Sequence, residues 1–292
     1  MFTIRNFSDG IRFSGEFHAL REFLLKNADG GVNEHFHSGR LEWMMAHSYL
    51  ETDRVSKSAL FYDESGALAG AAVFDTGYCD RWYLLRKKDD EALLCRMVSY
   101  AEAEDGENAV FRVNDRDCAL ERFLFDKGYR KSRTESVLEI GLDKEHEYIL
   151  PEGIRVLSEN RQIDLKEYSR VVHRGFDHEG EPEEPNEEVR KAQKYLMSPH
   201  YIKVFTERNM EYLSHTGVWY DGGDTAYIEP VVTVPEWRGK GLGRAAVYEA
   251  INRAKRRGAK RAIVLSDQIF YKKLGMMVSS RVGVWERNAK DR

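Results

Sequence analysis

A short run of glycines and basic residues in the second half of the chain has the composition of a phosphate-binding loop. Three glycines alternate with other residues in Arg238-Gly239-Lys240-Gly241-Leu242-Gly243, and Arg244 follows. Glycines let the backbone turn sharply and leave its amides uncovered. At the start of a helix, such amides and the helix dipole favour an anion, and the basic side chains add positive charge. The chemistry indicated is binding of a phosphate or diphosphate.

Two common phosphate-binding loops do not fit these residues. A Walker A loop needs Gly-x-x-x-x-Gly-Lys-Ser/Thr, which the sequence lacks. A dinucleotide fingerprint needs Gly-x-Gly-x-x-Gly, but position 244 is Arg. The longer phrase from Val232 to Gly243, Val-x-Val-Pro-x-x-Arg-Gly-x-Gly-Leu-Gly, is more specific than its glycines alone.

The elements on either side of the loop would hold it between a strand and a helix. Residues 227–234 are rich in β-branched and aromatic side chains, which predicts a buried strand ending at Pro235. Pro230 removes one ladder donor from that strand, so we expect a bulge or a splayed neighbour there. After the loop, apolar residues recur at helical spacing: Leu242, Ala246, Val247, Ala250, Ile251 and Ala254.

This phrase resembles the acetyl-CoA motif of the GNAT superfamily of N-acetyltransferases. The family pattern Arg/Gln-x-x-Gly-x-Gly/Ala is matched by Arg238, Gly241 and Gly243. A second segment, residues 270–276, is similar to the family's Tyr-x-x-Leu-Gly-Phe element, with Met276 in place of the usual Phe. The resemblance implies an enzyme in which an amine directly attacks the thioester of acetyl-CoA, the acyl donor.

The resemblance also assigns the residues that would hold acetyl-CoA. The diphosphate would lie on the loop amides with help from the basic side chains, and the pantetheine would pair with the strand end, where an N–H could stabilise an oxyanion. The predicted binding residues are Val232, Thr233, Val234, Arg238, Gly239, Lys240, Gly241, Leu242, Gly243 and Arg244.

Two further residues are candidates for proton transfer. Glu229 lies where GNAT members often place the general base, and it could act through a water; the alternative is a structural carboxylate. Asp224 and Glu236 are weaker candidates for the base. Tyr271 matches the family's general acid for the departing thiolate, although it could be a packing tyrosine. Ser266 lies where many members have Asn, so its contact with the cofactor is an open question.

The acceptor is predicted to be a small-molecule or peptide amine. Residues 178–188 are strongly acidic, and in this fold they would border the acceptor cleft. They could attract a cationic amine, or they could be a solvated loop. His35 and His37 have no third ligand at a suitable spacing, so we expect no metal site.

Hydrophobic patterning and turn residues predict two successive sets of elements. The first half has predicted strands at 2–7, 58–62, 67–74, 81–85, 109–113 and 136–140, and helices at 17–25, 40–50, 91–101 and 117–126. The second half has predicted strands at 153–157, 201–206, 215–220, 227–234, 261–265 and 278–285, and helices at 165–176, 187–197, 242–254 and 268–274.

Similar phrases in both halves indicate an α/β (α+β) fold of two tandem GNAT-like domains, each a mixed, mostly antiparallel twisted sheet flanked by helices. The predicted domains are 1–145 and 153–292, with the charged segment 143–152 as linker. The first domain has no glycine after Leu85, where its phosphate loop should lie, and three acids follow instead. We therefore expect a degenerate copy without the cofactor; the alternative is an unrelated α/β domain.

Bulk properties narrow the class of protein. The net charge of −4 does not favour nucleic-acid binding, and no apolar run is long enough to cross a bilayer or resembles a signal peptide. Cys79, Cys95 and Cys118 are widely spaced, which predicts reduced thiols in a cytoplasmic protein. Edge strands could support a homodimer. The alternative to an N-acetyltransferase is a non-catalytic acyl-CoA-binding or sensor protein.

Overall fold

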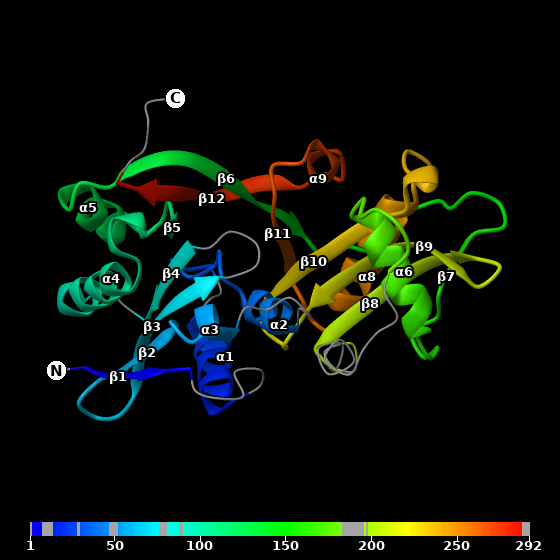
Figure 1. Cartoon of the computed structure of the whole chain (residues 1–292). Coiled ribbons are helices and arrows are strands. Elements are labelled where there is room, and N and C mark those ends of the chain that lie inside the picture. Colours follow the sequence, from blue (N-terminus) through cyan, green and yellow to red (C-terminus); the bar gives the residue numbers. More distant parts are fainter. Residues whose placement is uncertain are drawn as a thin grey trace. The chain divides into compact units, whose positions relative to one another are not determined.

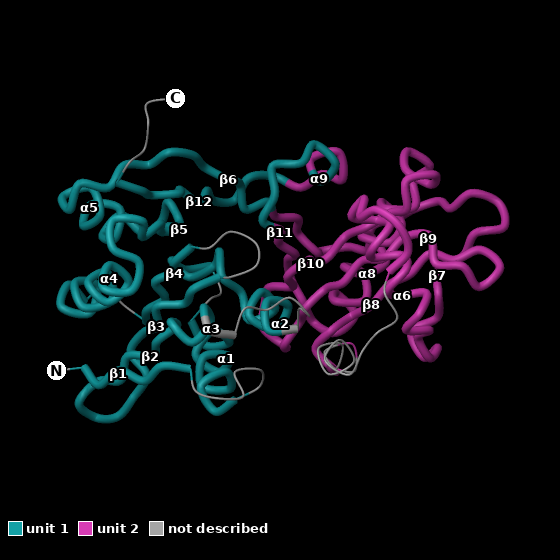
Figure 2. The backbone as a smooth tube through the Cα atoms, viewed as in Figure 1, with its two compact units in different colours: residues 1–138, 265–271, 277–292 teal, residues 139–264, 272–276 magenta. Residues whose placement is uncertain are grey.

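The chain folds into two compact units, which are described here separately. The computed structural model describes residues 2–7, 14–27, 30–46, 52–75, 81–87, 90–182, 196 and 198–287. Unit 1 comprises residues 1–138, 265–271 and 277–292, and unit 2 comprises residues 139–264 and 272–276 (Figure 2). Each unit contains several neighbouring strands with helices beside them (Figure 1).

The sheet of unit 1 is mixed. Its strand order is β1-β2-β3-β4-β5-β12-β6. The ladders β1–β2, β2–β3, β3–β4 and β5–β12 are antiparallel, and β4–β5 is parallel. The strands are β1 (Thr3–Asn6), β2 (Ala59–Tyr62), β3 (Leu68–Asp75), β4 (Arg81–Arg86), β5 (Phe111–Asn114), β6 (Arg130–Gly141) and β12 (Met277–Glu286).

Helices cover both faces of this sheet, so its strands bury apolar side chains in both directions. In β4, Tyr83 and Leu85 belong to one apolar cluster with residues of α1 (Gly15–Asn27) and α2 (Ser38–Ala46). Trp82 and Leu84 belong to a second cluster with residues of α4 (Glu91–Asp105) and α5 (Cys118–Asp126). A strand buried on both faces reads as a continuous apolar run, as β4 does.

Unit 2 has a sheet in the order β11-β10-β9-β8-β7. The ladders are antiparallel except for β10 with β11, which is parallel. The strands are β7 (Arg155–Val156), β8 (Tyr201–Arg208), β9 (Glu211–Trp219), β10 (Thr225–Thr233) and β11 (Arg261–Leu265).

Two helices pack on opposite faces of the unit 2 sheet. On one face, Tyr168 of α6 (Leu165–Gly175) makes ring contacts with Phe205 and His215. On the other face, the hydroxyl of Ser214 donates to the carbonyl of Leu242 at the start of α8 (Leu242–Arg256). Because successive strand residues point to opposite faces, His215 and Ser214 contact different helices.

Most predicted elements are confirmed within two or three residues, and so is the fold class. The predicted helix 187–197 falls almost entirely outside the described residues, and Cys79 also lies outside them. The short helix α3 (Thr52–Val55) was not predicted, and β6 begins at Arg130, six residues before the predicted start. Within the described part of the chain, no helix combines the length and apolar character needed to span a bilayer.

The last strand has a different partner from the one expected. From the sequence, residues 278–285 are expected to complete the sheet of the second domain. Instead, β12 pairs with β5 of unit 1, with Val282 opposite Asn114 and Trp285 opposite Phe111. Local patterning predicts a strand at this position, but it cannot say which strand will pair with it.

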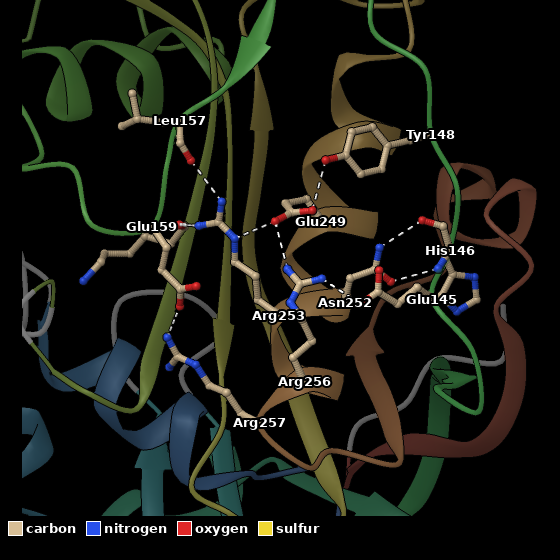
Figure 3. Close-up of polar contacts among 11 residues, drawn as sticks. Glu145, His146, Tyr148, Leu157, Glu159, Glu249, Asn252, Arg253, Arg256 and Arg257 are labelled. Atoms are coloured by element: carbon tan, nitrogen blue, oxygen red, sulfur yellow. Dashed lines mark hydrogen bonds and ion pairs between the residues drawn. The ribbon is translucent and has the colours of Figure 1, made fainter.

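Residues 143–152, expected to be a linker, form a strap whose residues Glu145, His146 and Tyr148 lie along α8 (Figure 3). The side chain of Asn252 bonds both backbone groups of His146: its oxygen accepts from the N–H at 2.8 Å, and its nitrogen donates to the carbonyl at 2.9 Å. The Tyr148 hydroxyl donates to Glu249 at 3.0 Å. Arg253 donates to Glu249 and, at 2.9 Å, to the carbonyl of Leu157. These bonds hold the strap and Leu157 against the second half of α8.

Candidate active site

The central strand β10 is interrupted where Pro230 predicts it. Its ladder with β9 shifts register between Ile228 and Val231, so Glu229 and Pro230 form a bulge. The peptide bond between these two residues is cis. Pairing with β11 covers only Thr225 to Tyr227. The expected bulge is therefore confirmed, and the second half of β10 has β9 as its ladder partner.

The glycine loop crosses from β10 to α8 as expected. A short 3₁₀ turn, η3 (Pro235–Trp237), follows the strand. Gly239 and Gly241 then adopt positive φ angles of 75° and 88°. Gly241 is the N-cap of α8, and no side chain caps the helix. The first amides of α8 therefore precede its regular hydrogen bonding, which is the geometry that binds anions at helix N-termini.

The basic side chains of the loop have different roles in the structure. The guanidinium of Arg238 donates to the carbonyls of Thr233 at 3.0 Å and Gly175 at 2.8 Å, and it forms an ion pair with Asp177. Arg238 therefore braces the loop against the end of α6. The ammonium of Lys240 lies 4.4 Å from the centre of the Trp237 ring. Arg244, in the first turn of α8, is exposed.

The end of β10 is packed closely by α6. A Cβ placed on Gly175 would lie only 2.5 Å from the Cβ of Val232, so a glycine allows this approach. Val232 pairs with His215 and Thr233 with Ser214, and the N–H of Val234 donates to Leu213 at 3.0 Å. Gly175 could not be identified from the sequence, since nothing local marks a contact 57 residues away.

Three carboxylates near β10 were considered as the base, and their surroundings differ. Glu229 is half-buried and accepts a hydrogen bond from the Tyr227 hydroxyl. Glu236 is exposed; a backbone hydrogen bond, and next its bond to Arg174, lower its pKa. Asp224 is exposed and forms an ion pair with Lys260 at 2.8 Å. A lowered pKa makes Glu236 a weaker base, and the ion pair with Lys260 occupies Asp224.

Tyr271 and Ser266 lie in the segment of residues 265–271 that belongs to unit 1. Tyr271 is buried on α9 (Ile269–Lys273), and its ring packs edge-on against Phe270 at 5.0 Å. The Ser266 hydroxyl accepts from the N–H of Gln268. The structure thus groups Glu229, the strand end and the loop in unit 2.

The acidic segment is described only from His178 to Pro182. The carbonyl of Glu179 is 3.0 Å from Nε2 of His173 on α6. The remaining acids, from Glu183 onward, lie outside the described residues.

His35 and His37, the two histidines considered as metal ligands, are both hydrogen-bonded to other groups of the protein. His35 Nε2 lies 3.1 Å from the carbonyl of Arg112, and His37 Nδ1 accepts from the N–H of Gly39 at 3.1 Å. The described residues contain no cluster of three or more His, Cys, Asp or Glu side chains suited to a metal.

In unit 1, side chains of the chain itself bond the described residues at the end of β4 and at the start of α4. The carboxamide of Asn33 donates to the carbonyl of Arg86 at 2.8 Å and accepts from its N–H at 3.1 Å. The Arg86 guanidinium is fully buried and makes a two-bond ion pair with Asp117. At the start of α4, Asp90 is the N-cap and accepts from the N–H of Leu93.

Comparison with known proteins identifies one similar family and several similar structures. Residues 163–276 match the Acetyltransferase (GNAT) family model. No curated protein matches the chain. Among solved structures, a tandem GNAT protein from the clavulanic acid biosynthesis pathway is 13% identical, with a TM-score of 0.60 over 98% of this chain and 97% of its own.

A second structure is a GCN5-related N-acetyltransferase from Sphaerobacter thermophilus, 15% identical over 97% of this chain and 94% of its own, with a TM-score of 0.56. A third, from Kribbella flavida, is 15% identical over 75% of this chain and 87% of its own, with a TM-score of 0.53. At these identities the likeness concerns the fold alone. Residues 163–276 are thus a GNAT acetyltransferase domain, in a chain with the fold of tandem GNAT proteins.

Proposed function

We propose that this protein is an acetyl-CoA-dependent N-acetyltransferase that transfers the acetyl group to a primary amine by direct attack. The observation that carries the proposal is the start of α8 at Gly241, without a side-chain cap, directly after the bulged strand β10. A helix N-terminus of this kind suits a diphosphate, and GNAT enzymes take acetyl-CoA as their acyl donor.

Residues of unit 2 would bind acetyl-CoA and take the proton from the acceptor. The amides of Gly239 to Arg244 bind the diphosphate, Lys240 and Arg244 add positive charge, and Arg238 braces the loop. The backbone of Val232 to Val234 aligns the pantetheine and presents an N–H to the thioester oxygen. Glu229 takes a proton from the acceptor ammonium, directly or through a water.

Two roles in the proposal lie outside this group of residues. Tyr271 would return a proton to the departing thiolate of CoA. The acceptor would be a cationic small molecule or a peptide amine, attracted by the acids of residues 178–188. Replacing Glu179 and Glu181 with Gln should raise KM for a cationic acceptor, most at low salt. An unchanged KM at all salt concentrations would remove these acids from the proposal.

We also propose that residues 1–145 and 153–292 are tandem copies of one domain, and that only the second binds acetyl-CoA. The support is the contrast between the occupied crossing in unit 1 and the uncapped one in unit 2.

The proposal is tested by calorimetric titration of acetyl-CoA into the wild-type protein and Gly241→Glu. A side chain at Gly241 is strained by its φ of 88° and would place a carboxylate at the anion site. We expect one site per chain in the wild type and none in the variant. Gly222→Glu is the control, because Gly222 also has a positive φ and open surroundings.

Turnover is tested by release of free thiol from acetyl-CoA with a panel of primary amines. Release that depends on the amine and is lost in Gly241→Glu supports the transferase. Binding without release for every amine would favour a sensor, and the absence of binding would overturn both. Two sites per chain would show that unit 1 also binds the donor.

A further inference from the structure

Four charged side chains join the end of α6 to the segment that leads into the glycine loop. The guanidinium of Arg174, in the last turn of α6, forms an ion pair with Glu236 of η3. The carboxylate of Asp177, two residues beyond α6, forms an ion pair with Arg238 at 3.0 Å. Each segment contributes one positive and one negative group, so the two pairs have opposite polarity. We refer to these four residues as the α6 clamp.

Arg238 also completes the C-terminus of α6. Its Nη2 donates at 2.8 Å to the carbonyl of Gly175, one of the last carbonyls of the helix, which have no partner within it. A cation is favourable at this end, because the helix dipole places partial negative charge there. Asp177 adds a negative charge at the same end, which is unfavourable without an accompanying cation. Arg238 supplies that cation from a distant part of the chain.

The same guanidinium reaches the end of β10. Nε of Arg238 donates to the carbonyl of Thr233 at 3.0 Å. Gly175 approaches the strand so closely that a Cβ on it would lie 2.5 Å from that of Val232. Gly239, the next residue after Arg238, has a φ of 75° and begins the turn of the loop. The end of α6, the end of β10 and the entry of the loop are therefore fixed to one another at Arg238.

The ion pair of Arg174 fixes a second residue of the same segment. Glu236 lies in η3, between the strand end and Arg238, and the N–H of Arg238 donates to the carbonyl of Pro235 within that turn. A backbone hydrogen bond, then Arg174, and then Arg170 lower the pKa of Glu236, so its carboxyl group is ionised near pH 7. The α6 clamp thus holds the segment before the loop at two residues, Glu236 and Arg238.

Both ion pairs are accessible to water, which limits the size of their effect. The four side chains are between 29% and 62% exposed. Ion pairs of this exposure change an equilibrium constant by about two- to fivefold, and salt screens them. A change of this size is small compared with the stability of a fold, but it is measurable in the affinity of a ligand for the loop.

We propose that Arg174, Asp177 and Glu236 are positioning residues for the acyl donor: with Arg238 they hold the entry of the glycine loop against the end of α6. The loop amides are then arranged for a diphosphate before it binds. A site that is arranged in advance avoids the entropy cost of ordering the loop on binding. This inference rests on the proposed function, in which the loop binds the diphosphate of acetyl-CoA.

The direction of a change in affinity provides the test. Glu236→Gln and Asp177→Asn each remove a negative charge near the proposed anion site. If these charges acted only at a distance, both variants would bind acetyl-CoA more tightly. If the clamp positions the loop, calorimetric titration should show about threefold weaker binding in both. Glu159→Gln is the matched control, because it breaks the similarly exposed pair with Arg257 at the other end of α8 and should leave the Kd unchanged.

Variants of Arg174 separate the ion pair from its single charges. Arg174→Gln should weaken binding by the same factor as Glu236→Gln, although the two change the net charge in opposite directions. Their combination should bind no more weakly than either single variant, because only one ion pair is lost. Arg174→Lys keeps the cation and should bind nearly as well as the wild type. Tighter binding in both Glu236→Gln and Asp177→Asn would overturn the proposal, and so would additive weakening in the double variant.

A measurement without ligand separates this inference from the proposed function. In the full-length protein, ¹⁵N relaxation reports the order of the Gly239 and Gly241 amides. Glu236→Gln should lower their heteronuclear NOE. Gly222, which also has a positive φ and open surroundings in unit 2, should be unchanged. Absence of acetyl-CoA binding in the wild type would overturn the proposed function, whereas unchanged loop amides in Glu236→Gln would overturn the positioning role by itself.

Discussion

The two strand-to-helix crossings, β4 to α4 in unit 1 and β10 to α8 in unit 2, differ in what satisfies their polar groups. In unit 1, Asn33 bonds the backbone of Arg86 at the strand end, and the carboxylate of Asp90 caps the helix. In unit 2, a bulge interrupts the strand, and the helix begins at Gly241 without a side-chain cap. In unit 1, side chains of the chain itself bond the strand end and the helix start. In unit 2, the helix start has backbone N–H groups that an anion could bind.

The two crossings show two ways in which the polar groups between a strand and a helix can be arranged. Buried backbone groups must be hydrogen-bonded, and a side-chain amide offers the same donor and acceptor as a neighbouring peptide. Asn33 therefore acts like an added strand residue on β4. The carboxylate of Asp90 occupies the place where a helix would attract a phosphate. Four predictions test this contrast.

The largest effect is expected from breaking the buried ion pair of unit 1. Arg86→Leu leaves Asp117 charged and unpaired in the interior, which should cost about 3–5 kcal/mol of unfolding free energy. Chemical denaturation measures the loss. Combining it with Asp117→Asn, which can still cap α5, should recover much of the stability. A loss below about 1 kcal/mol would mean that this pair contributes little to the unit 1 crossing.

Acid should destabilise the same region through His35. Burial lowers the pKa of His35 to about 4, so the folded chain holds the neutral ring while an unfolded histidine takes up a proton near pH 6.5. The unfolding free energy should therefore decrease as the pH falls below 6.5, by about 2 kcal/mol from this residue at pH 5. Denaturation curves of the wild type and His35→Phe measure it. An equally steep pH dependence in the variant would exclude His35 as the cause.

In unit 2, α6 packs so closely on the end of β10 that one added methyl group should lower the stability of the fold. Gly175→Ala places a Cβ 2.5 Å from that of Val232 and should cost about 1–2 kcal/mol despite the better helix propensity of alanine. It should also weaken acetyl-CoA binding by displacing Val232. Gly15→Ala, at an open position in α1, is the matched control. Equal stability of the two variants would show that the contact relaxes easily.

The smallest effect is expected from Asp90→Ala, which removes the cap of α4. Loss of an N-cap typically costs about 1 kcal/mol. Calorimetry should still find no acetyl-CoA site in unit 1, because Asn33 remains bonded to Arg86. A second site in Asp90→Ala would show that the cap alone excludes the ligand.

The sequence by itself determined the locally encoded features. Alternating and helical hydrophobic patterns predicted most of the observed strands and helices. A strand or helix that buries one face must repeat apolar residues at the spacing of that face. Pro230 predicted the bulge in β10, since proline removes a ladder donor. The glycines at 239 and 241 predicted the turn, and both have the positive φ that favours glycine.

Only the tertiary structure decided which distant residues meet. β12 pairs with β5, Asn33 bonds Arg86, and Gly175 packs on Val232. The strap on α8 had the composition of a linker. These contacts depend on strand partner and register, which local spacing leaves undetermined because it sets the face of a side chain but not its neighbour. The glycine turn lies within one continuous segment, so its backbone conformation could be predicted, whereas contacts between distant segments form only on folding.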